Sequence, residues 1–102
     1  EFFMAINVVR DFELVTLGIT GRLDTTTAPN LEAVINEISE DTKELVFNMA
    51  ELEYISSAGI RVLLSAYKKI NQSGGIMRIE KENDIVREVF EMTGLLEMLH
   101  QE

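Results

Sequence analysis

The sequence predicts a single α/β domain, built on a mixed, mostly parallel sheet of about four or five strands with helices packed on it. Three observations indicate this fold class. Short runs rich in β-branched residues alternate along the chain with longer amphipathic segments. Residues 44–48 form an apolar run with polar ends, typical of a central parallel strand covered on both faces. At 102 residues, with 46% hydrophobic and 26% charged residues, the chain can bury one core.

The first two strands are expected at residues 5–10 and 13–21. Asp11 and Phe12 separate them, so we expect a tight turn and a hairpin at the edge of the sheet. In the second run apolar residues occupy every other position, and glycine and threonine stand between them. This alternation indicates a strand with one buried face.

The first helix is expected to begin within residues 25–29, which read Thr-Thr-Thr-Ala-Pro. Threonine suits the N-cap, and proline is tolerated in the first turn because its missing N–H would be unpaired anyway. The core stripe of this helix recurs at helical spacing and comprises Leu31, Val34, Ile35 and Ile38. The central strand at 44–48 follows.

A second helix is expected at about residues 57–71. Its apolar face comprises Ile60, Leu63, Leu64, Tyr67 and Ile70. Its polar face carries basic residues that we expect in solvent, with two lysines near the negative end of the helix dipole: Arg61, Lys68 and Lys69. Glycines 74 and 75 are expected to end it.

A strand at 76–79 and a third helix complete the pattern, with Asn83 or Asp84 as the N-cap and Gly94 at the end. Residues 95–99 suggest a short final helix. The predicted order is therefore β-β-α-β-α-β-α-α, with the helix-linked strands parallel and their crossovers right-handed.

Composition excludes several functions. Nine basic and 18 acidic residues give a net charge of −9, which opposes binding to nucleic acid. The chain has no cysteine and only one histidine, His100, so no metal site is expected. No apolar run is long enough to cross a membrane, and we expect a cytoplasmic protein. Residues 4–102 are expected to form the domain, while residues 1–3 before Met4 read as a cloning remnant or a disordered start.

Two serines mark the most informative position. Ser56 and Ser57 lie where a strand-to-helix loop becomes the second helix. The first turn of a helix offers unpaired N–H groups and the positive end of the dipole, which suit a phosphate or a phosphorylated serine. A serine at this position can equally be an ordinary N-cap.

Four segments together resemble the STAS domain of bacterial anti-sigma-factor antagonists. They are residues 21–24 (Gly-Arg-Leu-Asp), 45–49, 54–64 and 92–95. The resemblance covers nearly the whole chain in order and spacing. It implies a regulator, not an enzyme, that in its unphosphorylated form binds an anti-sigma factor serine kinase and releases the sigma factor. The kinase would switch it off by phosphorylating a serine, and a metal-dependent serine phosphatase would reverse the change.

The resemblance also assigns site residues. Ser57 matches the phosphorylated serine, with Ser56 as the alternative because it stands where relatives often carry aspartate. The Asp24 turn would lie near the phosphorylation loop. The positions expected to contact the partner are Asp24, Thr25, Asn48, Ser56, Gly59 and Arg61, with Gly59 allowing a close backbone approach.

The sequence is compatible with two other functions. Ser57, Asp84 and His100 occur in the chain order of an α/β-hydrolase triad, but the nucleophile-elbow motif is incomplete because Ile55 replaces its first glycine. The stronger alternative is a STAS-type interaction or scaffold module that phosphorylation does not regulate. We expect a monomer without a cofactor.

Overall fold

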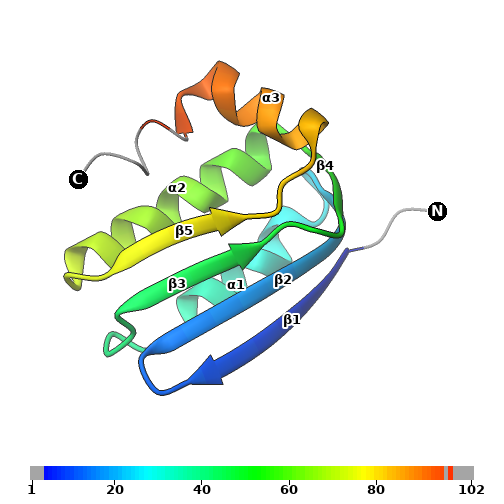
Figure 1. Cartoon of the computed structure of the whole chain (residues 1–102). Coiled ribbons are helices and arrows are strands. Elements are labelled where there is room, and N and C mark those ends of the chain that lie inside the picture. Colours follow the sequence, from blue (N-terminus) through cyan, green and yellow to red (C-terminus); the bar gives the residue numbers. More distant parts are fainter. Residues whose placement is uncertain (1–3, 96, 98–102) are drawn as a thin grey trace.

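The structure is a computed structural model that describes residues 4–95 and residue 97, and it confirms the α/β class (Figure 1). Within these residues, five strands and three helices follow one another in the order β-β-α-β-β-α-β-α. The elements are β1 (Met4–Asp11), β2 (Leu14–Leu23), α1 (Ala28–Asn36), β3 (Glu44–Asn48), β4 (Leu52–Ile55), α2 (Ser57–Gln72), β5 (Ile76–Glu80) and α3 (Asp84–Thr93). The short final helix predicted at 95–99 lies mostly outside the described residues.

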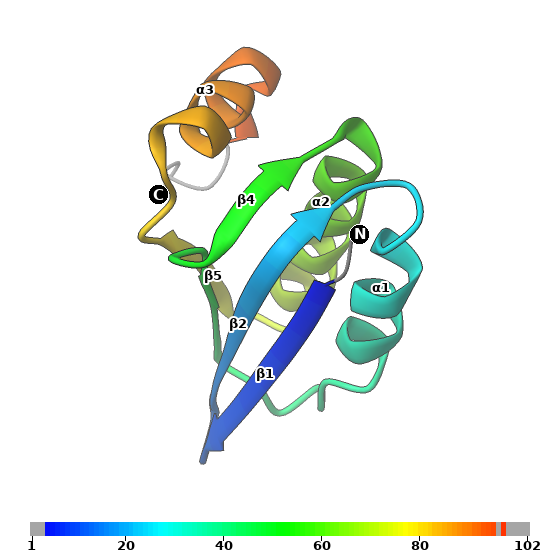
Figure 2. The ribbon, with the colours of Figure 1, turned by 90° about the vertical axis from the view of Figure 1, so that its right-hand side faces the viewer.

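The sheet is mixed, as predicted. β1 pairs antiparallel with β2 along its length, from Met4 opposite Gly21 to Asp11 opposite Leu14. β2 pairs in parallel with β3, and β3 pairs in parallel with β5. Figure 1 shows α1 and α2 behind these strands, and the turned view in Figure 2 shows both helices on the same side of β1 and β2. α3 packs beside β4.

β4 is the strand that the sequence prediction missed. Leu52 and Ile55 are buried while the two residues between them are exposed, so the segment lacks the alternation of a half-buried strand. It pairs in parallel with the last residues of β2, where the register shifts between Gly21 and Arg22 as at a β-bulge. Gly21 adopts a positive φ of 98° there. Pairing in the fold, not local pattern, therefore makes this segment a strand.

The predicted core stripes face the core, where Val34, Leu64 and Tyr67 are only partly buried. In α1, Leu31 and Ile35 are buried, and in α2, Leu63 and Ile70 are buried. Leu17, Phe47 and Phe90 are among the large side chains with almost no exposure. The ends of α3 are also as predicted: the Asn83 carboxamide accepts from the Val86 N–H at 2.8 Å, and Gly94 adopts the left-handed conformation.

Lys69 differs from its expected place in solvent. Its ammonium group donates to the Ile35 and Asn36 carbonyl oxygens at the end of α1, at 3.1 and 3.3 Å. α1 carries no basic residue in its own last turn. The Ile35 carbonyl also accepts from the Ile38 N–H at 3.1 Å, so Lys69 adds a charged donor at the negative end of the α1 dipole and ties α2 to α1. In the part of the chain that the structure describes, no helix combines the length and apolar character needed to span a bilayer.

Candidate functional site

Two strand-to-helix junctions lie next to each other at one end of the molecule. β2 and β4 are parallel neighbours, with Leu23 opposite Ile55, so the segments that leave their carboxyl ends are adjacent. The Ser56 N–H donates to the Leu23 carbonyl at 2.9 Å. The Asp24 turn after β2 therefore stands beside the serine loop after β4.

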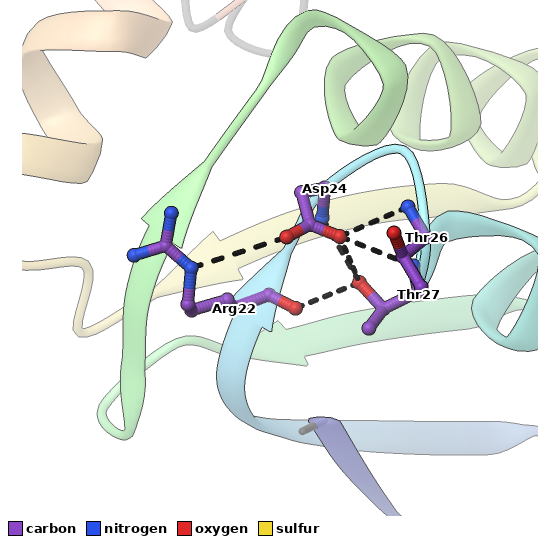
Figure 3. A network of polar contacts seen from close by, with 4 residues as sticks. All are labelled: Arg22, Asp24, Thr26 and Thr27. Carbon is purple, nitrogen blue, oxygen red and sulfur yellow. Dashed lines mark hydrogen bonds and ion pairs between the residues drawn. The ribbon is translucent and has the colours of Figure 1, made fainter. Parts of the chain in front are cut away.

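The Asp24 turn is closed by its own hydrogen bonds (Figure 3). One Asp24 carboxylate oxygen accepts from the N–H groups of Thr26 and Thr27, at 3.0 and 3.2 Å. The Thr27 hydroxyl donates to the Arg22 carbonyl at 2.7 Å and accepts from the Asp24 N–H at 2.9 Å. Thr27 occupies the N-cap of α1, as a threonine was expected to, but its hydroxyl makes no capping bond. It fixes the turn instead.

Arg22 connects this turn to β4. Its guanidinium lies over the Tyr54 ring, 4.2 Å from the ring centre, and its Nε stands 3.9 Å from an Asp24 carboxylate oxygen. Sequence reasoning missed Arg22, Tyr54 and Thr27. Arg22 was visible within the Gly-Arg-Leu-Asp segment, but its partner Tyr54 becomes a neighbour only through the β2–β4 pairing that was not predicted.

The two serines have opposite environments. Ser56 is the N-cap of α2, with extended backbone at φ −106° and ψ 178°, yet its hydroxyl makes no capping bond. The Ser56 Oγ is buried and has no hydrogen-bond partner among the described residues. Ser57 is the first residue of α2, and it is exposed. Ser57 is therefore the more accessible of the two residues to another protein.

Gly59 requires a correction. We expected its missing side chain to let a partner approach, but Gly59 is buried within the chain. A Cβ atom at this position would lie 2.7 Å from the Leu23 Cγ and 2.8 Å from the Ile55 Cγ1. Glycine is therefore needed to seat α2 on the ends of β2 and β4.

Thr25 and Arg61, both exposed, are brought together. They line a groove of about 250 Å³ between the first turns of α1 and α2. The other lining residues are mostly small or apolar, with one acidic side chain: Ala28, Pro29, Glu32, Ala58, Val62 and Ser65. Ala58, the residue after Ser57, belongs to the wall of this groove.

Asn48 lies apart from this groove. It ends β3 opposite Gly18 and Glu80, and its side-chain oxygen accepts from the Ala50 N–H at 3.0 Å. Among the described residues, no hydrogen bond joins Asn48 to either serine. Its partner contact stays a prediction.

The described part of the chain supports neither a metal site nor the α/β-hydrolase triad. There, no group of acidic or histidine side chains is arranged to hold a metal ion. Asp84 begins α3, and His100 lies outside the described residues, so the arrangement of the hydrolase triad is not described.

Comparison with known proteins gives a consistent family. The STAS domain model matches residues 5–101. The chain is 30% identical over 83 residues to the anti-sigma-B factor antagonist of Staphylococcus aureus (strain NCTC 8325 / PS 47), covering 80% of this chain and 77% of that protein. The chain therefore matches the STAS domain model and also a relative over most of that relative's length.

Solved structures show the same fold. An anti-sigma factor antagonist from Mycobacterium paratuberculosis has a TM-score of 0.85 at 23% identity, covering 96% of this chain and 84% of that one. The Bacillus cell fate determinant SpoIIAA in its phosphorylated form has a TM-score of 0.72 at 21% identity, covering 91% and 86%. From the family model and the staphylococcal relative, we conclude that this chain belongs to the STAS domain family.

Proposed function

We propose that the chain is an anti-sigma-factor antagonist that is switched off by phosphorylation of Ser57. In its unphosphorylated form it binds an anti-sigma factor serine kinase in the cytoplasm and frees the sigma factor. A serine phosphatase restores the active form. The chain acts as a monomeric binding protein and not as an enzyme. The relatives' names, anti-sigma factor antagonists, support the antagonist assignment.

One observation carries the choice of residue. The Ser57 hydroxyl is exposed at the first position of a 16-residue helix, while the neighbouring Ser56 Oγ is buried. A kinase must bring the γ-phosphate of ATP in line with the attacking oxygen, so a buried oxygen is a poor acceptor. Accessibility therefore favours Ser57 over Ser56.

The same position explains how a phosphate would act. Phosphorylation adds about −1.5 to −2 charges and three acceptor oxygens. The N–H groups and dipole of the first turn of α2 favour that charge locally, so the fold should tolerate it. A partner packed against a neutral hydroxyl would instead meet a bulky anion, and would lose affinity through repulsion and desolvation.

The groove beside Ser57 supplies a surface for the partner. Its wall contains Thr25 and Arg61, and the fixed Asp24 turn holds one side of it. Such a contact would let the kinase sense the state of Ser57 directly. Partner contacts by Asp24, Thr25, Ser56 and Arg61 are part of this proposal. The buried Gly59 contributes by seating α2 and not by touching the partner.

The test is phosphorylation by the cognate kinase with ATP, followed by mass-spectrometric mapping. We expect one phosphate on Ser57, which Ser57→Ala abolishes. Ser39→Ala, at an exposed serine outside the groove, is the matched control and should leave phosphorylation intact. A phosphate on Ser56 would refute the assignment of the residue. Tight binding without any phosphorylation would favour the unregulated scaffold module.

A further inference from the structure

We propose that Arg61 is the built-in counter-ion of a phosphate on Ser57, so that the phosphorylated chain carries its own neutralising cation one helical turn from the modification. The inference rests on the proposed function for the presence of the phosphate. It gives Arg61, already proposed to contact the partner, a second role in the phosphorylated chain.

Spacing on α2 places the two side chains together. Ser57 is the first residue of the helix, and Arg61 follows four positions later. Side chains four residues apart lie on the same face, and an acidic group N-terminal to a basic one is the favourable order. Both residues are exposed, so neither must leave the core to meet the other.

Arg61 is uncommitted in the unmodified chain. Within the described residues, the arginines that form ion pairs are Arg22, Arg78 and Arg87. Glu32 of α1 lines the same groove as Arg61, yet no ion pair joins them. The guanidinium is therefore available to a new anion and need not break an existing contact.

The other charged groups near this face work against a phosphate. Glu32 of α1 borders the groove, and Asp24 lies in the adjacent turn. Both are acidic, and the Arg22 guanidinium is already shared between Asp24 and Tyr54. Arg61 is thus the basic group of this face that can offset the added charge. Variants at position 61 leave Glu32 and Asp24 unchanged, so a difference between them reflects the Arg61 charge alone.

The experiment installs phosphoserine at position 57 during expression, by genetic code expansion, so that no kinase is needed. Phosphorus-31 NMR then follows the phosphate from about pH 4.5 to about pH 8, which spans the second pKa of phosphoserine near 6. An ion pair with Arg61 favours the dianion and lowers this pKa. We expect Arg61→Gln to raise the pKa by roughly 0.15–0.4 unit, and Arg61→Lys to keep most of the effect.

Lys68→Gln is the matched control, because it removes the same charge from the exposed face of the same helix. Lys68 lies about three turns away, roughly 16 Å along the axis, beyond the screening length of about 8 Å at physiological ionic strength. Its removal should leave the phosphate pKa unchanged. The inference is overturned if Arg61→Gln titrates like the parent, or if Lys68→Gln shifts the pKa as much.

Thermal melting gives a second readout with a defined sign. A phosphate whose pKa is lower in the folded than in the unfolded state stabilises the fold above the unfolded value, near pH 6, and loses this effect as the pH falls. The melting temperature of the phosphorylated chain should therefore gain more from raising the pH than that of its Arg61→Gln variant. Neither measurement uses the kinase, so failure here is separate from failure of the kinase assay.

Discussion

The two adjacent strand-to-helix junctions treat their polar groups in opposite ways. After β2, the Asp24 carboxylate and the Thr27 hydroxyl use their oxygen atoms to close the turn. After β4, the Ser56 hydroxyl is buried without a partner in the described structure, and α2 begins without a side-chain cap. Side chains close the turn before α1, whereas no side-chain hydrogen bond from Ser56 closes the loop before α2.

This difference suggests a division of roles. The hydrogen bond from the Ser56 N–H to the Leu23 carbonyl links the Asp24 turn to the serine loop before α2. Of the described helices, α3 is capped by the Asn83 side chain, while α1 and α2 both begin without a side-chain cap bond. An uncapped first turn that presents the Ser57 hydroxyl to solvent is suited to receive an anionic group.

The largest stability effect is expected where α2 is seated on both junctions. Gly59→Ala would place a Cβ 2.7 Å from the Leu23 Cγ, so the helix or the strands must shift. We expect a loss of about 1–3 kcal/mol in the free energy of unfolding, measured by urea denaturation. Gly18→Ala is the control, because its Cβ would meet Asn7 at an ordinary 3.8 Å. Equal stability of the two variants would contradict the packing described for Gly59.

The fixed turn should respond to loss of its carboxylate. Asp24→Ala leaves the N–H groups of Thr26 and Thr27 without their acceptor, and should cost about 1–2 kcal/mol in the free energy of unfolding. Asp41→Ala removes an exposed carboxylate that makes no hydrogen bond in the described structure, and should change stability little. If chemical denaturation finds the same cost for both, Asp24 does not fix the turn.

The smallest effect is the sharpest test of the open junction. Replacing an N-cap serine by alanine usually costs about 0.5–2 kcal/mol. Ser56→Ala should cost nothing or stabilise slightly, because it removes a buried hydroxyl that has no partner in the described structure. Asn83→Ala at α3 removes a real cap and should cost about 1 kcal/mol. Thermal melting of the two variants compares them directly, and a comparable loss in Ser56→Ala would show that α2 is capped after all.

Features set by neighbouring residues in the chain could be predicted from the sequence, whereas features set by contacts between distant segments could not. β3 was predicted with its observed bounds because its apolar run is a local signal, and Asn83 and Gly94 were found because caps are local too. β4 was missed because it becomes a strand only by pairing with β2 after Gly21. Lys69 was placed in solvent for the same reason, since the carbonyls it serves belong to another helix.

The candidate site divides in the same way. Its position was visible in the sequence, as two serines at the start of a helix with an aspartate turn upstream. The resemblance already favoured Ser57, with Ser56 as the alternative; the burial of the Ser56 Oγ, which no local pattern encodes, adds a structural argument for Ser57. The internal role of Gly59 depended on where Leu23 and Ile55 converge.

The most direct test of the switch is a titration of the cognate kinase with Ser57→Asp, which places a carboxylate at the open junction. We predict a loss of affinity of more than about tenfold, with a melting temperature close to that of the parent because the start of α2 favours an acidic group. Gln72→Glu adds the same charge at the far end of the helix and should bind like the parent. Unchanged affinity of a folded Ser57→Asp variant would contradict the proposal that Ser57 controls binding.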